Sequence, residues 1–222
     1  MRWNIPNILT TFRMLAAPAV VLVFLILARP YADWAALILF VGAAITDYLD
    51  GYLARKWNQQ SAFGTMLDPI ADKAMVILAF LAIVALYGMT FWIVVPATVI
   101  LLREVFVSGL REFLGDNASK LAVTKIAKWK TTAQMVAISV LFAQGVFEHK
   151  LGMLGQGMDD TLIGQILDGK EEDLVGLRWN YYGTIWSYWV GISLLWLAAA
   201  LTFITGWDYL TKAMPYLKGD AK

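Results

Sequence analysis

Six long apolar stretches constrain this chain more than any other feature of its sequence. They cover residues 14–28, 34–46, 74–87, 91–109, 131–147 and 182–204. Hydrophobic residues make up 59% of the 222 positions and charged residues only 16%, against about half and about a quarter in soluble domains. The mean hydropathy of +0.62 indicates that the apolar surplus faces lipid. The sequence therefore predicts an all-α integral membrane protein with about six transmembrane helices.

Residues 4–13, NIPNILTTFR, precede the first apolar stretch. The apolar residues Ile5, Ile8, Leu9 and Phe12 recur at helical spacing within this segment. We expect an interfacial amphipathic helix here, before the first span; the alternative is a frayed N-terminal turn. A secretory signal peptide is not expected, because no small-residue cleavage site follows the first apolar stretch.

The distribution of basic residues predicts the orientation in the membrane. Fourteen of the 18 lysines and arginines fall on one side of the predicted spans, together with both termini. That side should be cytoplasmic. The other side holds residues 148–181, a long acidic segment that we expect to form an extracytoplasmic loop. Residues 1–222 are interpreted as a single membrane domain without internal repeats.

The residue types available limit the chemistry. The chain has no cysteine and one histidine, His149, so a metal site would have to use carboxylates. His149 falls in the predicted loop and is not expected to be catalytic. The formal net charge of +1 indicates no general attraction to nucleic acid, which is not an expected partner.

Four aspartates interrupt the apolar pattern between the second and third stretches. Asp47 and Asp50 are three residues apart, and Asp68 and Asp72 are four apart, so each pair lies on one face of a helix. Counted from the outer ends of their spans at about 1.5 Å per residue, Asp47 lies roughly 20 Å and Asp72 roughly 22 Å into the membrane. The two pairs should therefore face each other at one depth, near the cytoplasmic headgroups.

Four neighbouring carboxylates at this depth need counter-charges. One aspartate at a span centre costs about 2.5–3.5 kcal/mol on insertion scales, and four would also repel one another. Arg55 and Lys73 can neutralise about half of this charge. Hard divalent cations favour oxygen ligands, and two of them would suit in-line displacement at phosphorus. Two other interpretations remain: an ion or proton pathway in a transporter, and helix capping with surface pairing at a cytoplasmic loop.

Small residues continue the face that begins at Asp47. Gly51 and Ala54 leave room for a large ligand against the helix backbone, and Arg55 lies one turn beyond Gly51. The complete pattern resembles the signature of the CDP-alcohol phosphotransferases at eight fixed positions. These positions are Asp47, Asp50, Gly51, Ala54, Arg55, Gly64, Asp68 and Asp72. Residues 4–13, 102–115 and 125–135 are also similar to the branch of the family that uses glycerol 3-phosphate.

The resemblance implies a role for each matching residue. Two Mg²⁺ or Mn²⁺ ions would be held by Asp47, Asp50, Asp68 and Asp72, and Asp72 would also be the general base. The CDP-diacylglycerol donor would be contacted by Asn7, Thr10, Arg13, Asp47, Asp50, Gly51, Ala54, Arg55 and Ser61. The family also implies a homodimer, cytoplasmic termini and transfer of the phosphatidyl group to an alcohol, in a bacterial inner membrane.

A second group of charged residues could bind the acceptor of such a transfer. Arg103 and Arg111 are eight residues apart and share a helix face, and arginine suits phosphate recognition. With Lys125 and Lys130 they would form a phosphate pocket for glycerol 3-phosphate. The alternative is that these residues only anchor the cytoplasmic side. Inositol phosphate, serine and phosphatidylglycerol stay open as other acceptors.

Overall fold

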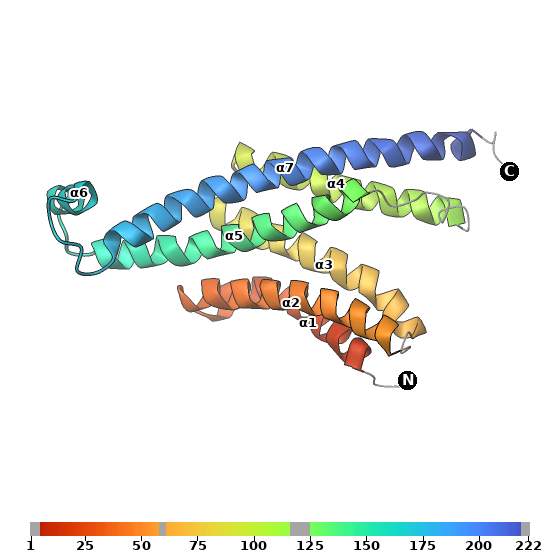
Figure 1. The fold of residues 1–222 in the computed structure, drawn as a ribbon, viewed down its shortest axis with the longest axis horizontal. Helices are drawn as coiled ribbons and strands as arrows, with labels where there is room; N and C mark the ends of the chain where they lie inside the picture. The colour runs from red at the N-terminus through yellow and green to blue at the C-terminus, as the bar shows by residue number, and fades with distance from the viewer. Residues whose placement is uncertain (1–4, 58–60, 116–124, 219–222) are drawn as a thin grey trace. The chain divides into compact units, whose positions relative to one another are not determined.

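The computed structural model describes residues 5–57, 61–115 and 125–218 (Figure 1), with the side chains of residues 6, 48–55 and 125–128 outside the description. These ranges contain helices and no strand. The helices are α1 (Ile5–Ile26), α2 (Tyr31–Lys56), α3 (Ala62–Tyr87), α4 (Phe91–Leu114), α5 (Lys125–Gly155), α6 (Asp160–Asp168) and α7 (Leu177–Leu217). The predicted all-α class is confirmed. Five of the six predicted spans lie within one long helix each, and the first, residues 14–28, ends two residues beyond α1.

Four helices in the described ranges are long and apolar enough to cross a bilayer: α1 from Asn7, α3, α4 and α7. The chain is therefore a multi-pass membrane protein, while the count of about six spans stays a prediction. The segment expected to form a separate interfacial helix is continuous with the first span, because α1 runs without a break from Ile5 to Ile26. An interfacial position for its first turns is untested.

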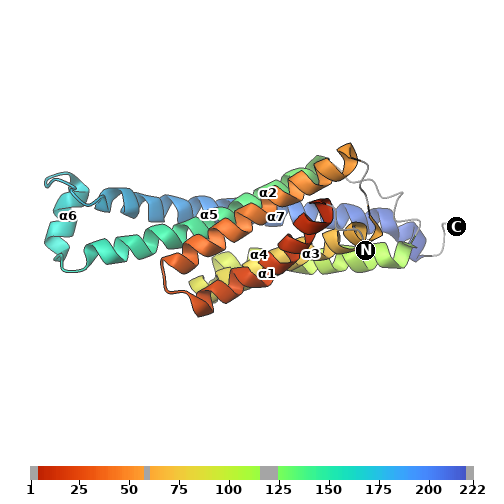
Figure 2. The same cartoon turned by 90° about the horizontal axis from the view of Figure 1, so that it is seen from below.

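The chain divides into two compact units. Unit 1 comprises residues 1–83 and 138–191, and unit 2 comprises residues 84–137 and 192–222, so α3, α5 and α7 contribute to both. Within unit 1, α1 and α2 pack side by side, as Figure 2 shows from below. Small residues at helical spacing, among them Ala17 in α1 and Ala32, Ala36 and Ala43 in α2, are completely buried and permit this approach.

A buried polar contact also holds unit 1 together. Arg29 donates two hydrogen bonds to the buried carboxylate of Asp33, at 2.8 and 2.9 Å. Its Nη2 also donates to the carbonyl oxygen of Gly145 in α5, at 3.2 Å. A Cβ at Gly145 would lie 2.6 Å from Asp33 Oδ1, so only glycine fits against this ion pair.

The segment 148–181 is more helical than the sequence predicts. The end of α5, all of α6 and the start of α7 lie within it. Its extracytoplasmic position stays a prediction. Asp159 begins α6 by accepting a hydrogen bond from the backbone N–H of Leu162, which holds the pKa of this carboxyl below its ordinary value. Gly169 ends α6 in the left-handed conformation at φ 79°. Asp173 accepts from the backbone N–H of Leu177 at the start of α7.

One buried core cluster of unit 2 lies between α4 and the second half of α7. Its buried residues are Val107, Leu110, Leu114, Tyr209 and Ala213. Tyr209 is the one polar-tipped residue in this cluster, and its hydroxyl contacts a charged group of α4, described below.

Candidate functional site

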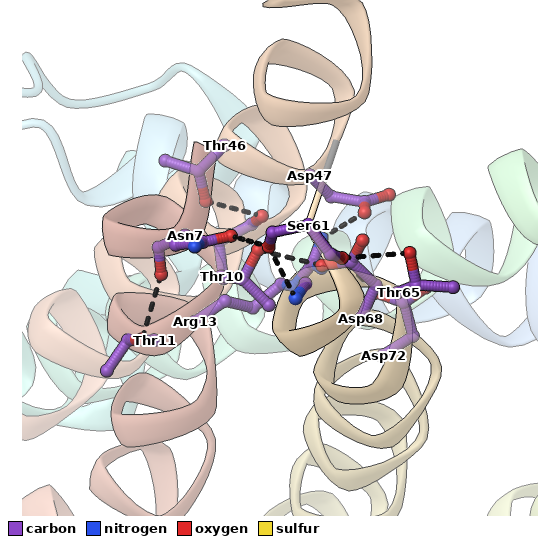
Figure 3. Close-up of polar contacts among 12 residues, drawn as sticks. Asn7, Thr10, Thr11, Arg13, Thr46, Asp47, Ser61, Thr65, Asp68 and Asp72 are labelled. Atoms are coloured by element: carbon purple, nitrogen blue, oxygen red, sulfur yellow. Dashed lines mark hydrogen bonds and ion pairs between the residues drawn. The ribbon is translucent and has the colours of Figure 1, made fainter. Parts of the chain in front are cut away.

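The guanidinium of Arg13 lies among three carboxylates contributed by two other helices (Figure 3). In α1, Arg13 forms an ion pair with Asp47 of α2 through its Nη1. Its Nη1 lies 3.3 Å from Asp72 Oδ1, and its Nη2 lies 3.4 Å from Asp68 Oδ1, both in α3. We call Arg13, Asp47, Asp68 and Asp72 the aspartate cluster. Asp47 of the first predicted acid pair and both members of the second therefore reach one guanidinium, which α1 supplies; the side chain of Asp50 lies outside the described ones.

Exposure divides the aspartate cluster into a buried cation and accessible anions. The Arg13 side chain is 2% exposed, whereas those of Asp47, Asp68 and Asp72 are 43%, 45% and 48% exposed. Three carboxylates against one guanidinium leave a surplus of negative charge. The accessible surface of the cluster can therefore attract cations.

Uncharged side chains hold the helices in this arrangement. Thr10 Oγ1 donates to Asp68 Oδ1 at 2.7 Å. Ser61 Oγ donates to Asn7 Oδ1 at 2.6 Å and accepts from the backbone N–H of Gly64 at 3.0 Å, which joins α1 to the first turn of α3. A Cβ at Gly64 would lie 3.0 Å from Asn7 Oδ1, so a larger residue would disturb this junction.

The donor set suits a hard divalent cation, although its present geometry does not form a coordination shell. Among the described side chains, no three acidic groups, histidines or cysteines are arranged to hold a metal ion, since the Arg13 guanidinium lies between the carboxylates. Magnesium takes oxygen ligands at about 2.0–2.1 Å. The three accessible carboxylates offer such oxygens once the guanidinium withdraws, so the residues fit a metal by chemistry.

Unit 2 contains a second group of charged side chains, in which positive charge is in surplus. In α4, Arg103 Nη1 donates to Glu104 Oε1 at 3.1 Å, and Lys130 Nζ of α5 forms an ion pair with the same oxygen. Arg111 Nη2, also in α4, donates to the hydroxyl of Tyr209 at 2.8 Å. These five residues are the basic cluster. Three cations and one carboxylate give it a net charge of about +2, which suits an anion.

A family model described as CDP-alcohol phosphatidyltransferase matches residues 3–169. The chain belongs to this family. The matched region includes the whole aspartate cluster as well as Arg103, Glu104, Arg111 and Lys130 of the basic cluster.

Relatives extend the similarity of this family member to its full length. The chain is 56% identical over 220 residues to a CDP-diacylglycerol–glycerol-3-phosphate 3-phosphatidyltransferase of Cereibacter sphaeroides, covering 99% of this chain and 100% of the relative. It is 36% identical over 215 residues to the protein of the same name from Escherichia coli strain K12, covering 96% of each. A Haemophilus influenzae protein of that name is 46% identical over 143 residues, which cover 64% of this chain and 76% of the relative.

The described site residues predicted from the sequence fall into two groups, one within unit 1 and one within unit 2. Thr10 and Arg13 reach the aspartates, and Asn7 bonds to Ser61. Arg103 and Lys130 share Glu104, whereas Arg111 joins them through Tyr209 and not directly. Other predicted site residues have side chains outside the described ones: Asp50, Gly51, Ala54, Arg55 and Lys125.

Two residues of the basic cluster escaped the sequence analysis. Glu104 could have been predicted from the sequence, because an acidic residue within an apolar stretch costs free energy unless it has a partner. Tyr209 could not have been predicted. It is 98 positions from Arg111, and no local pattern distinguishes it from the other tyrosines of the chain.

Proposed function

We propose that this chain transfers the phosphatidyl group of CDP-diacylglycerol to the 1-hydroxyl of glycerol 3-phosphate in a metal-dependent reaction. The products would be phosphatidylglycerophosphate and CMP, in the synthesis of phosphatidylglycerol. Support comes from the full-length relatives that bear the name of this activity. The single structural observation behind the proposal is the meeting of three accessible carboxylates from α2 and α3 at Arg13.

The aspartates would hold two Mg²⁺ or Mn²⁺ ions through Asp47, Asp50, Asp68 and Asp72. When bound, these ions would supply positive charge against the pyrophosphate of the donor. Arg13 would then exchange its carboxylate partners for donor phosphate, which a guanidinium binds equally well. This exchange would let one arginine neutralise the aspartates in the free protein and contact the substrate in the complex.

Asp72 would act as the general base of the transfer. Its carboxylate would accept the proton of the acceptor hydroxyl, and the resulting oxygen would attack the phosphorus that carries diacylglycerol. The bond from that phosphorus to the bridging oxygen would break, and CMP would leave with both electrons of the bond. No covalent enzyme intermediate is required.

The two substrates would use different residues. The donor would contact Asn7, Thr10, Arg13, Asp47, Asp50, Gly51, Ala54, Arg55 and Ser61. The phosphate of glycerol 3-phosphate would bind Arg103 and Arg111, with Lys125 and Lys130. A phosphomonoester carries about −1.5 to −2 charges at neutral pH, which complements the surplus of the basic cluster.

The basic residues favour a cytoplasmic location for both termini and for the reaction. We place the protein in a bacterial inner membrane, because its relatives are bacterial. A homodimer is part of the proposal and rests on the family resemblance alone.

Purified full-length protein in detergent micelles tests the reaction. It should release CMP from CDP-diacylglycerol when glycerol 3-phosphate and Mg²⁺ or Mn²⁺ are both present, and removal of the metal by a chelator should stop the release. Serine, inositol phosphate and phosphatidylglycerol serve as competing acceptors. A preference for one of these would replace the proposed acceptor, and turnover that persists without metal would remove the metal from the proposal.

A further inference from the structure

Tyr209 of α7 contacts both arginines of the basic cluster. Its hydroxyl accepts the hydrogen bond from Arg111 Nη2 at 2.8 Å. The guanidinium carbons of Arg103 and Arg111 lie 5.6 Å and 5.3 Å from the centre of its ring. Both distances fall within the roughly 6 Å at which a cation is attracted to an aromatic face. One side chain thus contacts two cations that lie two helical turns apart in α4.

Tyr209 is itself firmly held. It is 3% exposed and packs in the core cluster with Val107, Leu110 and Leu114 of α4 and with Ala213 of α7. Packing of this kind restricts a ring to one rotamer. The three α4 residues belong to the helix that carries the arginines, so the ring is fixed relative to the cations it contacts.

Gly206 lies one helical turn before Tyr209 and controls the approach of Arg103. A Cβ at this position would lie 2.9 Å from Arg103 Cγ, closer than side-chain atoms normally come. The glycine is in the interior of α7, so its backbone would accept alanine. The missing side chain is therefore required by the stem of Arg103 and not by the helix.

Arg103 keeps one donor for a ligand. Its Nη1 is committed to Glu104, but its buried Nε–H has no hydrogen-bond acceptor in the part of the chain that the structure describes. A buried donor without an acceptor costs free energy. An anion bound at the basic cluster would satisfy it.

We infer that Gly206 and Tyr209 are positioning residues that hold Arg103 and Arg111 as one pair for a phosphomonoester dianion. This inference rests on the proposed function, in which that dianion is the phosphate of glycerol 3-phosphate. Tyr209 fixes the spacing of the two guanidinium groups, and Gly206 lets the Arg103 stem pass close to α7. The second half of α7 thereby determines acceptor affinity without supplying a charge.

The test compares Tyr209→Phe, Tyr209→Leu and Gly206→Ala with the wild-type protein in detergent micelles. Tyr209→Phe keeps the ring and removes the hydroxyl, so the KM for glycerol 3-phosphate should rise about three- to tenfold, as expected for one lost hydrogen bond. Tyr209→Leu should have a larger effect, and Gly206→Ala an effect similar to that of Tyr209→Phe. The kcat and the KM for CDP-diacylglycerol should stay within about twofold in all three variants, as for loss of acceptor binding that is equal in the ground state and the transition state.

A matched control is Gly109→Ala in α4, where a Cβ would meet nothing within 4 Å. It should keep the wild-type constants. Binding of inorganic phosphate, measured by calorimetry on the same proteins, provides a readout that needs no turnover. Its affinity should fall in parallel with the rise in KM.

The inference would be overturned if Tyr209→Phe and Gly206→Ala kept the acceptor KM and the phosphate affinity of the wild-type protein. Transfer to glycerol 3-phosphate by the wild-type protein would in that case leave the proposed function intact. An equal loss for both substrates, with a lower thermal midpoint, would also overturn it by showing a general structural role. If the wild-type protein transfers nothing to glycerol 3-phosphate, the proposed function fails separately, and phosphate calorimetry still judges the two positioning residues.

Discussion

The aspartate cluster of unit 1 and the basic cluster of unit 2 both contain ion pairs, but the charge in surplus is exposed in the first and mostly buried in the second. In the aspartate cluster the surplus charges are 43–48% exposed around a buried Arg13. In the basic cluster two of the three cations are largely buried, with Arg103 13% and Lys130 6% exposed beside Glu104, whereas Arg111 is exposed. Exposed carboxylates can exchange one cation for another at little cost, whereas buried cations are held in place. The first cluster is suited to exchanging a cation, and the second to presenting fixed cations to an anion.

The largest expected effect comes from removing the base while keeping the shape of the aspartate cluster. Asp72→Asn should lower kcat by about 10²- to 10⁴-fold, because an amide cannot accept the proton of the attacking hydroxyl. Binding of CDP-diacylglycerol should remain measurable, since Asp47 and Asp68 are unchanged. Single-turnover assays across a range of pH measure the first quantity, and equilibrium binding of the donor measures the second.

Substantial turnover by Asp72→Asn at any pH would exclude Asp72 as the base. The difference in exposure between the two clusters would still hold, but the general base would have to be another residue of the aspartate cluster.

Removing a carboxylate should weaken cation binding in the aspartate cluster only. Losing an outer hydrogen-bond partner of a metal ligand already costs about 10- to 100-fold in metal affinity, so Asp47→Ala or Asp68→Ala should raise the Mn²⁺ concentration for half-maximal activity by at least about that factor. Donor affinity should fall with it. Direct Mn²⁺ binding, followed by electron paramagnetic resonance, checks the change independently of turnover. Wild-type Mn²⁺ affinity in both variants would contradict the proposed metal site.

The converse experiment removes a fixed cation from the basic cluster. A hydrogen bond to a charged group contributes about 1.5–3 kcal/mol, so Arg103→Gln or Arg111→Gln should raise the KM for glycerol 3-phosphate roughly ten- to a hundredfold. The KM for CDP-diacylglycerol should change little. Lysine at either position should restore only part of the affinity, because it lacks the planar fork of arginine.

Steady-state kinetics with each substrate varied in turn provide the measurement. If both glutamine variants keep normal acceptor affinity, these arginines serve only to orient the chain in the membrane, and the two clusters do not divide the substrates between them.

The smallest expected effect concerns an uncharged support of the aspartate cluster. Thr10→Val removes the hydrogen bond to Asp68 and leaves the side-chain volume nearly unchanged. A loss of about 1 kcal/mol corresponds to roughly a fivefold rise in the Mn²⁺ concentration for half-maximal activity. Thr11→Val is the matched control, because the Thr11 hydroxyl donates to the carbonyl oxygen of Asn7, four residues earlier in the same helix. Equal effects of the two variants would show that Thr10 acts on α1 and not on Asp68.

The sequence was sufficient for those features that depend on local spacing. Five of the six apolar stretches lie within one helix each, and the first ends two residues beyond α1. Asp47, Asp68 and Asp72, which helical spacing places on shared faces, reach one guanidinium. Contacts between segments that are far apart in the sequence could be predicted less well. Arg13 was expected to contact the nucleotide, and nothing in its surroundings in the sequence indicated that it would lie between three carboxylates.

Helix ends were predicted poorly for a related reason. The apolar pattern stops near Phe147 and resumes near Tyr182, but helices continue wherever caps satisfy the backbone, as Asp159, Gly169 and Asp173 do here. Hydropathy locates the lipid-facing part of a helix, while capping residues decide where the helix stops. Arg103 and Arg111 both contact Tyr209 because α4 packs against α7 there. No pattern in a single sequence indicates that packing.

The position of Arg13 also bears on how such a protein is made. A ribosome delivers each span to the insertion machinery before any ligand can be assembled around it, and carboxylates entering lipid at that stage are unfavourable. Because α1, which emerges before α2 and α3, carries a cation that later contacts carboxylates of those two helices, the chain brings its own counter-ion to membrane insertion. Binding of the proposed metal ions can then follow membrane insertion and need not be a condition for it.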